Sequence, residues 1–301
     1  MDKFNTRTTI KNTSILSTLT TTDRDGKRKL SFRAKRWLVI LSVHMLFFLS
    51  FSIDIQVLEG TLNGSRFLGF HLIDTFSTFE VYLATHHLSV NMIIGSLTVL
   101  SIYILVGGRT YCSWICPYGL LSEIGEKLHN TLVNKKIIKE RAFSNKVRYF
   151  FWILFLTLSF GSGYLVFETI NVVGILSRAI TYGWSVALSW VLAVLLIEIF
   201  FSRRAWCKYI CPIGTTYSLL GYVSATRIEW NDSCDHCMVC HDVCFEDQVL
   251  ELTKQKYDKE REEKGITHEY IKSGDCTLCG RCADVCHQDA LNFNFRWKEL
   301  V

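Results

Sequence analysis

"CDHCMVCHDVC" occupies residues Cys234 to Cys244 of this chain, and "CTLCGRCADVC" occupies residues Cys276 to Cys286. Both segments follow one spacing, CxxCxxCxxxC, in which three cysteines recur at intervals of three and a fourth follows four positions later. Three thiolates at the shorter spacing bind one iron-sulfur cube, while the fourth reaches the neighbouring cube of a two-cluster protein. The two segments therefore predict a pair of 4Fe-4S clusters that exchange their fourth ligands.

Each predicted cluster takes three cysteines from one motif and the last cysteine of the other. The first set is Cys234, Cys237, Cys240 and Cys286, and the second set is Cys276, Cys279, Cys282 and Cys244. The alternative is a pair of zinc sites, which the spacing disfavours because such sites use two separated CxxC pairs and need no third evenly spaced cysteine. Phe245 and His287 stand where bacterial ferredoxins usually have proline, a difference that removes no ligand.

Hydrophobic residues make up 49% of the 301 residues, and much of this apolar content lies in four runs with almost no charge. The runs are Trp37 to Ile53, Ser89 to Val106, Tyr149 to Phe167 and Trp184 to Phe201. Each reaches the length of roughly 17 residues with which a helix can cross a hydrocarbon layer. The alternative, buried helices of a soluble protein, fits poorly with the basic residues that flank the runs. We therefore expect four transmembrane helices.

Lysine and arginine are distributed unevenly between the predicted loops. They are frequent in residues 1–36, 109–148 and 202–301, whereas the two other connections contain only Arg66 and Arg178. Because loops rich in these residues stay in the cytoplasm, both termini are expected there, with all twelve cysteines on that side or at its boundary, where thiols are kept reduced. This topology accounts for the net charge of +5, so nothing indicates a nucleic-acid partner.

The sequence thus predicts an α-helical membrane protein, with four transmembrane helices duplicated as two plus two, and a C-terminal α+β two-cluster ferredoxin domain of the bacterial type. The expected domains are a basic cytoplasmic tail at 1–36, a four-helix membrane domain at 37–225 and a ferredoxin domain with two 4Fe-4S clusters at 226–301. Residues 5–29 of this tail are rich in threonine and serine and are expected to be disordered. The tail lacks a small-residue cleavage site before the first apolar run, so that run is interpreted as an anchor.

The chain contains only two prolines, and each directly follows the second cysteine of a CxxxC motif. The motifs are "YCSWICPYGLL" from Tyr111 and "WCKYICPIGTT" from Trp206, so CxxxCP spans residues 112–117 and 207–212. Residues i and i+4 share a helix face, so the two cysteines of each motif are expected to project in one direction. Proline suits the first turn of a new helix, whose positive end would favour thiolates. Four nearby basic residues add to this effect: Arg109, Arg203, Arg204 and Lys208.

Two apolar runs followed by CxxxCP occur twice, which indicates an internal duplication. After Pro117 a leucine or isoleucine recurs every four residues, which predicts an amphipathic helix at the surface. With both motifs on one side of the membrane, four sulfurs could meet: those of Cys112, Cys116, Cys207 and Cys211. Three hypotheses stay open for them, namely a third redox centre that holds iron, a thiol site that docks or exchanges with a partner, and a purely structural turn.

The four apolar runs, "RTYCSWICP", "WCKYICPIG" and the two C-terminal motifs followed by "FNFRW" resemble the NapH family, the membrane ferredoxin-type component of the periplasmic nitrate reductase system. The resemblance extends from about Arg36 to Trp297. The CxxxCP pair alone is shared with the NosR and CcoG families, so its order and spacing relative to the ferredoxin motifs favour NapH. NosR-type proteins carry an additional large exported domain, and the amino-terminal tail shows nothing like it.

The resemblance implies a quinol dehydrogenase component of the bacterial inner membrane. Proteins of this family are thought to take electrons from membrane quinol and pass them toward nitrate reductase, through a NapG-type periplasmic ferredoxin and c-type cytochromes. This chain would be an electron-transfer subunit with no nitrate chemistry of its own, so whether it is itself an enzyme stays open. Two alternatives remain: an oxidase-assembly factor of CcoG type that handles copper or iron, and a non-catalytic anchor or scaffold for a redox partner.

Oxidation of quinol releases protons, so it requires a carboxylate or an imidazole near a membrane face. The segment "GFHLIDTFSTFEVYLATHHLS" between the first two runs supplies Asp74, Glu80 and His86, and Glu168 directly follows the third run. These four residues are the candidates for a quinol site; the alternative is that they are polar groups in solvated loops. Glu198 lies inside the fourth run, where an ionisable group is either functional or the ion-pair partner of nearby basic residues.

Overall fold

The computed structural model describes residues 19–22, 28–53, 58–67, 69–257, 261 and 263–296. Most of the tail that the sequence predicts to be disordered lies outside these residues. Its described part includes strand β1, Thr20–Thr22, and most of strand β2, Arg28–Leu30, and the two strands pair in antiparallel register. The prediction of disorder is therefore wrong for these residues.

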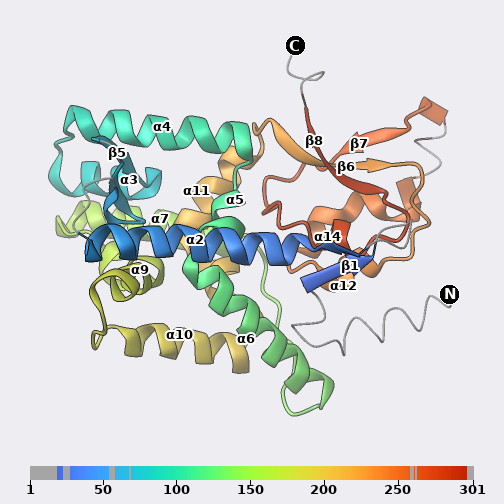
Figure 1. Ribbon diagram of the computed structural model, residues 1–301, viewed down its shortest axis with the longest axis horizontal. Coiled ribbons are helices and arrows are strands. Elements are labelled where there is room, and N and C mark those ends of the chain that lie inside the picture. The colour runs from blue at the N-terminus through green and yellow to red at the C-terminus, as the bar shows by residue number, and fades with distance from the viewer. Residues whose placement is uncertain are drawn as a thin grey trace. The chain divides into compact units, whose positions relative to one another are not determined.

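The chain divides into two compact units. The described parts of residues 1–38, together with 104–114 and 218–301, form one unit, which we call the cysteine-rich unit. The described parts of residues 39–103 and 115–217 form the other, which we call the helical unit. Figure 1 labels many of the elements of both units.

The cysteine-rich unit is built on a three-stranded antiparallel sheet. Strand β6, Thr226–Asn231, lies between β7, His268–Tyr270, and β8, Leu291–Phe295 (Figure 1). Successive side chains of a strand point to opposite faces, so Ile228 and Trp230 point to the same face, and both are buried. They pack in a core with Cys240, Val249, Leu250, Ile271, Leu278, Cys282 and Leu291.

Short helices accompany this sheet, so the unit has the α+β character that the sequence predicts for its C-terminal part. They are α5, Thr110–Trp114; α12, Val239–Val243; η3, Asp247–Thr253; η4, Gln255–Tyr257; and α14, Arg281–Asp284. Helices α12 and α14 carry the third cysteine of the first and second motif, respectively. The cysteine motifs therefore alternate loop and helix in the same way.

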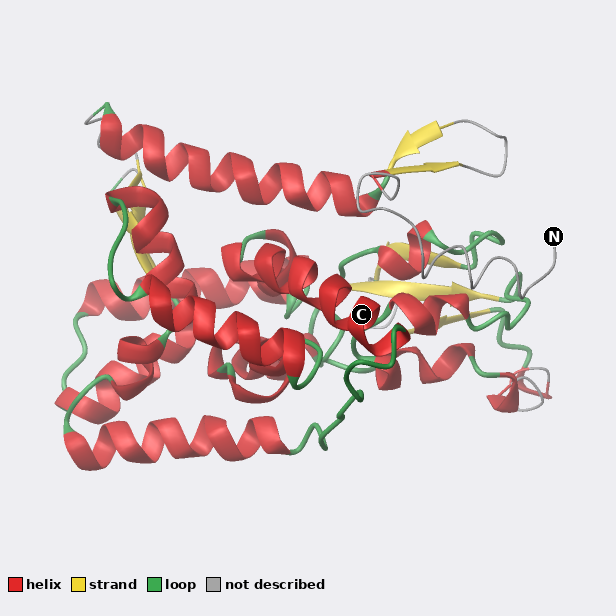
Figure 2. Cartoon of the chain, turned by 90° about the horizontal axis from the view of Figure 1, so that it is seen from below, coloured by secondary structure: helices red, strands yellow, loops and turns green. Residues whose placement is uncertain are grey.

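The helical unit consists mainly of helices, which Figure 2 draws in red. Helix α6 packs against α9 and α10, and α3 packs against α7. Three helices have residues in both units: α2, Phe32–Ser52; α4, Val90–Val106; and α11, Pro212–Gly221. The other elements are β3, Leu58–Thr61; β4, Gly64–Phe67; β5, Phe70–Ile73; α3, Thr75–Thr85; α6, Pro117–Asn134; α7, Val147–Ser162; α8, Val166–Ile170; α9, Val172–Tyr182; α10, Leu188–Phe200; and η2, Trp206–Ile210.

Helices α2, α4, α7 and α10 overlap the four apolar runs of the sequence, and α2 and α7 begin before their runs, at Phe32 and Val147. Among the described residues, α2 is the one helix long and apolar enough to cross a membrane, and the other three are shorter apolar helices. Helix α7 ends at Ser162 because Gly163 adopts a left-handed conformation with φ of 68°. Helix α10 begins at Leu188, later than the run that starts at Trp184. The predicted helices are present, and their crossing of a membrane stays a prediction.

The helical unit buries polar side chains and exposes apolar ones. Glu80, Glu126, His129 and Glu198 are at most 3% exposed. In contrast, large apolar side chains on four helices are more than half exposed: Leu41 on α2, Leu97 on α4, Ile153 on α7 and Leu192 on α10. A soluble protein shows the opposite preference, since burial of apolar surface drives its folding.

Helix α6 shows the same inversion in detail. The sequence predicts that its apolar stripe defines an amphipathic surface helix, and the helix is amphipathic. Ile124 and Leu128 of that stripe are exposed by 43% and 48%, while Ser122, Glu126 and His129 are buried. The polar face therefore points into the helical unit, and the prediction is corrected in this respect.

Candidate iron-sulfur and redox sites

One cavity of the cysteine-rich unit is lined by four cysteines that come from both motifs. Cys244 belongs to the first motif, and Cys276, Cys279 and Cys282 belong to the second. Much of the remaining lining is apolar: Ile228, Phe245, Val249, Leu250 and Ile271. Four thiols in an apolar enclosure are the donor set that 4Fe-4S clusters use. The structure brings the second predicted ligand set together, and these residues fit such a cluster.

The cysteines of the first predicted set are also gathered. The Cys240 sulfur interacts electrostatically with those of Cys234, Cys237 and Cys286. Cys286 again comes from the other motif, and its sulfur accepts a hydrogen bond from the backbone N–H of Ala290 at 3.3 Å. The fourth cysteine of each motif thus lies with the first three of the other, as the spacing predicts.

The backbone of both motifs has the same unusual conformation. His236 and Leu278, at equivalent positions, have φ of 54° and 50°, and Met238 and Gly280, two residues later, have φ of 62° and 72°. Left-handed residues alternating with right-handed ones turn successive N–H groups toward one concave side, an arrangement that binds anions and iron-sulfur clusters. Of these four residues only Gly280 adopts the conformation without steric cost. The repeated strain at the other three supports the fit of both motifs to clusters.

Burial makes the thiolate form of these cysteines costly in the absence of a cation. Loss of solvent raises the pKa of Cys240 to about 11 and that of Cys276 to about 12. Arg109 and Arg227 act in the opposite direction on Cys276. A coordinated metal removes the thiol proton outright, so a bound cluster would relieve this penalty.

The residue that replaces the usual proline after the second motif contacts the first cluster site. His287 Nε2 lies 3.2 Å from Asp235 Oδ2, and Asp235 Oδ1 accepts a hydrogen bond from the Cys237 N–H at 3.2 Å. Donor atoms of all three side chains lie within 4.8 Å of one another. Since Cys237 is assigned to the first cluster, we regard this group as part of that site. Nothing in the spacing of the motifs predicts that His287 and Asp235 pair.

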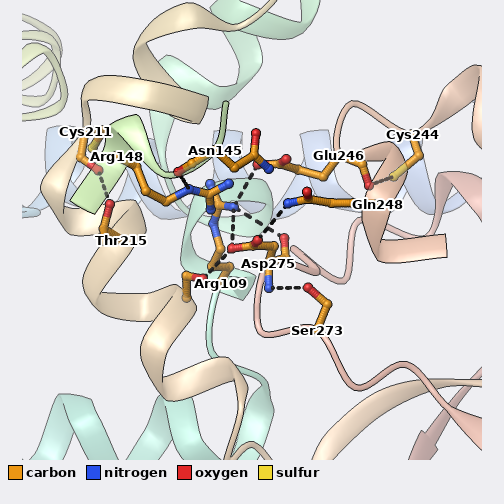
Figure 3. A network of polar contacts seen from close by, with 11 residues as sticks. Arg109, Asn145, Arg148, Cys211, Thr215, Cys244, Glu246, Gln248, Ser273 and Asp275 are labelled. Carbon is orange, nitrogen blue, oxygen red and sulfur yellow. Dashed lines mark hydrogen bonds and ion pairs between the residues drawn. The ribbon is translucent and has the colours of Figure 1, made fainter. Parts of the chain in front are cut away.

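Arg109 enters the second site from a segment far from both motifs. Its Nη1 lies 3.2 Å from Glu246 Oε1 and 3.7 Å from Asp275 Oδ1 (Figure 3). Gln248 Nε2 donates to Asp275 Oδ2 at 3.2 Å, and the Cys244 thiol donates to the Glu246 carbonyl at 3.4 Å. Glu246 and Asp275 also belong to the lining of the cavity. Sequence reasoning placed Arg109 beside the CxxxCP motif and missed these partners, which are distant along the chain.

The CxxxCP prolines begin helices, as the sequence predicts. Pro117 starts α6 and Pro212 starts α11. The prediction that the two cysteines of each motif share one helix face is wrong. Helix α5 ends at Trp114, before Cys116, and the π-helix η2 ends at Ile210, before Cys211. The second cysteine of each motif is extended, because the residue before proline is excluded from the helical region.

The expected thiolate character is not found at Cys207. The surrounding protein desolvates its thiol and raises its pKa, and Glu198, Cys116 and Cys211 raise it further, while Arg204 alone among its main partners lowers it. Arg204 is itself paired, since its Nε lies 2.8 Å from Glu126 Oε2. Loss of solvent around the buried Cys207 thiol therefore outweighs the stabilising effect of the positive charge of Arg204.

Three of the four quinol-site candidates lie in one polar region of the helical unit. Asp74 caps α3 by accepting from the Ser77 N–H at 3.1 Å, and Tyr217 donates to its other oxygen at 2.9 Å. Glu80 Oε1 accepts from Ser159 Oγ at 2.8 Å and from the Phe167 N–H at 2.7 Å.

Burial raises the pKa of Asp74 and of Glu80, and the negative charge of Glu168 adds to both shifts. Glu168 is partly exposed and accepts two hydrogen bonds from Asn63, at 2.9 and 2.7 Å. His86 differs from these three carboxylates, since it is exposed and ends α3 with φ of 55°.

Glu198 is 1% exposed and is held by neutral donors. Ser122 Oγ donates to its Oε2 at 2.7 Å, and the Trp206 N–H donates to its Oε1 at 3.0 Å. The expected ion-pair partners of Glu198 were Arg203 and Lys208, but Arg203 lies 3.9 Å from Glu126 and 3.7 Å from Glu140, and the basic residue that interacts with Glu198 is Arg204. The partners from α6 were not predictable, since the spacing marks its polar face as solvated.

Family models match most of the region after the first helix. A 4Fe-4S binding domain matches twice, over residues 88–137 and 182–231, and each match contains one CxxxCP motif. A 4Fe-4S dicluster domain matches residues 233–290, which contain the eight clustered cysteines. The double match agrees with the predicted internal duplication.

Known proteins with the same motifs extend this result. The ferredoxin-type protein NapH of Haemophilus influenzae is 32% identical over 261 residues, covering 85% of this chain and 87% of that protein. NapH of Escherichia coli is 27% identical over 274 residues, covering 88% and 92%. The methylamine utilization ferredoxin-type protein MauN of Paracoccus denitrificans is 30% identical over 225 residues, covering 73% and 75%. No solved structure matches the chain.

The paired motifs and their geometry define an iron-sulfur electron-transfer protein of the two-cluster ferredoxin type. Within that class, the chain belongs to the NapH family of ferredoxin-type proteins.

Proposed function

We propose that this protein is a component of the bacterial inner membrane that oxidises quinol and passes electrons toward a periplasmic nitrate reductase, through a NapG-type ferredoxin and c-type cytochromes. The crosswise grouping of the eight cysteines carries the electron-transfer part of this proposal. Cys244 lines the cavity of the second motif, and Cys286 lies with the first motif. Membership in the NapH family supports the nitrate system, and the similarity to MauN makes a methylamine system the second candidate.

The chain would hold its cofactors with the two predicted ligand sets, within the proposed ferredoxin domain at residues 226–301. Each bound 4Fe-4S cluster supplies one-electron redox chemistry. The protein residues provide four thiolates per site, N–H groups turned toward the concave side by the left-handed residues, and an apolar lining that excludes water. Two such sites match the two electrons of one quinol.

The inverted polarity of the helical unit supports a membrane-embedded domain, for which we propose the bounds 37–225. Leucine and isoleucine side chains that are more than half exposed would contact lipid, while buried carboxylates such as Glu126 and Glu198 are kept away from it. Apolar helices shorter than about 17 residues reach across a bilayer with the help of flanking residues or local thinning. We propose four spanning helices and place both termini, and with them the basic tail at 1–36, in the cytoplasm.

Quinol oxidation to quinone breaks two O–H bonds and releases two protons with the two electrons. Glu80 is the best supported proton acceptor of the four candidates. Its side chain is completely buried, its Oε1 takes two hydrogen bonds, and its Oε2 has no hydrogen-bond partner among the described residues. A carboxylate whose pKa is raised by burial is a stronger base near neutral pH than an ordinary one. Glu168, partly exposed and 3.9 Å from Arg178, offers the exit toward solvent.

Single cysteine-to-serine variants test the electron-transfer function. The full chain is purified anaerobically in detergent, and iron, sulfide and EPR spectra are measured. We expect Cys244→Ser to disturb the same EPR signal as Cys279→Ser, and Cys286→Ser to disturb the same signal as Cys237→Ser. The crosswise ligand sets would be contradicted if Cys244→Ser disturbed the same EPR signal as Cys237→Ser, and Cys286→Ser the same signal as Cys279→Ser. Wild-type protein without iron would exclude the function altogether.

The same preparation decides between the hypotheses for the CxxxCP cysteines. Two clusters account for about eight iron atoms, so a third iron centre predicts a higher content that falls when Cys112, Cys116, Cys207 and Cys211 are changed to serine. The match of a 4Fe-4S binding domain to both CxxxCP regions favours this outcome. Unchanged iron with lost copper or iron delivery would favour an assembly factor of CcoG type. Intact quinol-dependent electron flow without the eight ferredoxin cysteines would favour a scaffold.

A further inference from the structure

Arg109 places a buried positive charge beside the second cluster site. Its side chain is 2% exposed, and its two acidic partners flank the ligands of that site: Glu246 follows Cys244 by two residues, and Asp275 directly precedes Cys276. Nη1 also donates to the Asp275 carbonyl at 3.4 Å. The guanidinium is always protonated in proteins, so this charge does not depend on pH.

Helix α5, which follows Arg109, is bonded to the same loop. Ser113 Oγ donates to the Thr277 carbonyl at 2.5 Å, and Trp114 Nε1 donates to the Leu278 carbonyl at 2.9 Å. Thr277 and Leu278 are the two residues between the first two cysteines of the second motif. The segment that carries the first CxxxCP cysteine thus fixes the position of Arg109 relative to this loop.

We propose that Arg109 is a positioning residue that sets the reduction potential of the second cluster, defined by Cys244, Cys276, Cys279 and Cys282. An electron that arrives at this site adds negative charge, which a fixed positive charge stabilises and a fixed negative charge opposes. Inside a protein this interaction is screened far less than in water. Arg109 offsets the negative charge of the Glu246 and Asp275 carboxylates. Without Arg109 the cluster would be harder to reduce. This inference rests on the proposed function, since it requires a cluster at the second site.

Substitutions that change the local net charge at Arg109 and Glu246 distinguish an electrostatic role of Arg109 from a structural one. We expect Arg109→Gln to lower the equilibrium constant for one-electron reduction of the second cluster by at least tenfold, which corresponds to about 59 mV. Glu246→Gln removes a negative charge and is expected to shift the potential in the opposite direction. The double variant restores the local net charge while the ion pair is absent, so its potential is expected to return toward the wild-type value. Arg109→Lys keeps the positive charge, so the reduction potential of its second cluster is expected to lie close to the wild-type value.

Arg261 provides a matched control in the same unit. It is also a buried arginine in an ion pair, with Nη2 2.8 Å from Glu269 Oε2, and its guanidinium stacks 3.9 Å from the centre of the Trp230 ring. None of the cavity-lining residues of the second site is among these partners. Arg261→Gln is therefore expected to leave the potential of the second cluster unchanged, even where it lowers thermal stability.

The measurement is an EPR-monitored redox titration of the full chain, purified anaerobically with its clusters. The transition that Cys279→Ser alters is assigned to the second cluster. Equal potentials in wild type, Arg109→Gln and Glu246→Gln, all loaded with iron, would overturn the inference, as would equal shifts of both clusters. If Arg109→Gln does not retain iron, the opposite shift in Glu246→Gln still decides the question. A wild-type protein without cluster signals would refute the proposed function instead, so the two failures are distinguishable.

Discussion

Cys116 and Cys211 have nearly the same backbone conformation, with φ of −63° and −65° and ψ of 119° and 112°. Each directly precedes the proline that begins a helix. Proline excludes the helical region for the residue before it and is preorganised for the first helical position. The two prolines of the chain therefore have the same effect on the backbone. Each ends a helical turn before the cysteine and begins the next helix directly after it.

Replacement of either proline by alanine is expected to lower stability by a similar amount. Pro117→Ala and Pro212→Ala relax the preceding cysteine and enlarge the conformational freedom of the unfolded chain, at a cost of about 0.4 to 1 kcal/mol each. Thermal unfolding of the full chain in detergent measures the effect. Glycine at the same positions is expected to cost more. A loss of stability in only one of the two alanine variants would contradict the structural equivalence of the motifs.

Gly107→Ala is expected to disturb the docking of α5. Gly107 has φ of 122°, a region that side chains strongly disfavour, and an added Cβ would collide with the Leu278 side chain. The backbone strain alone is worth about 1 to 3 kcal/mol. We expect a lower unfolding midpoint together with loss of iron from the second cluster site, measured by chemical analysis. Gly64→Ala is the control, since an added Cβ there meets no atom within 4 Å. Equal effects of both variants would refute the explanation.

Two neighbouring arginines are expected to differ in their contribution to stability. Arg204 and Glu126 form an ion pair at 2.8 Å with side chains 8% and 3% exposed. Arg203 is more distant from Glu126, at 3.9 Å, and its other partner is Glu140 at 3.7 Å, which is 51% exposed. Arg204→Met leaves a buried carboxylate without its main cation and is expected to cost about 3 to 5 kcal/mol. Arg203→Met is expected to cost about 1 kcal/mol or less. Thermal unfolding of both variants at one pH tests this order, and equal losses would contradict it.

Glu80→Gln is expected to change the pH dependence of stability. Burial raises the pKa of Glu80 above its ordinary value of 4.5, and hydrogen bonds from Ser159 and Phe167 oppose the shift only in part. Above about pH 4.5 the unfolded chain loses this proton while the folded protein retains it, so the free energy of unfolding falls as pH rises toward the folded-state pKa. The glutamine variant lacks this loss.

The free energy of unfolding of Glu80→Gln relative to that of wild type is therefore expected to increase with pH. The total increase is about 1.4 kcal/mol for each unit by which the pKa of Glu80 is raised. Unfolding midpoints recorded from acidic to mildly alkaline pH provide the test. Glu140→Gln, at a carboxylate that is 51% exposed, is the matched control. Parallel pH profiles of wild type and Glu80→Gln would show that Glu80 does not retain its proton in the folded protein.

The sequence was most informative where spacing alone constrains geometry. The crosswise neighbours of Cys244 and Cys286 follow from the distances between cysteines, and the helix starts at Pro117 and Pro212 follow from the fixed φ of proline. The apolar runs located four helices because continuous hydrophobicity is a strong signal. Among the described residues, α2 alone is long and apolar enough to cross a membrane, so crossing by α4, α7 and α10 stays a prediction.

Contacts between distant segments were beyond sequence reasoning. Nothing in the chain indicates that Arg109 pairs with Glu246, or that the polar face of α6 points inward toward Glu198. In water a polar stripe predicts solvation, whereas in an apolar surrounding the same stripe is buried, so the period of the pattern does not give its direction. The thiolate prediction for Cys207 failed because burial of the thiol, which the spacing of the motif does not reveal, raises its pKa more than the positive charge of Arg204 lowers it.

The proposed exchange of the ligands Cys244 and Cys286 between the two clusters would have a consequence for biosynthesis. A nascent chain that has emerged from the ribosome only as far as Cys244 lacks the fourth thiol of the first site and three thiols of the second, so neither can be completed before the last motif is made. Metal loading is then a late event. Once both clusters are bound, their iron–thiolate bonds would cross-link the two motifs. A chain cleaved between residues 245 and 275 would then be held together by the clusters.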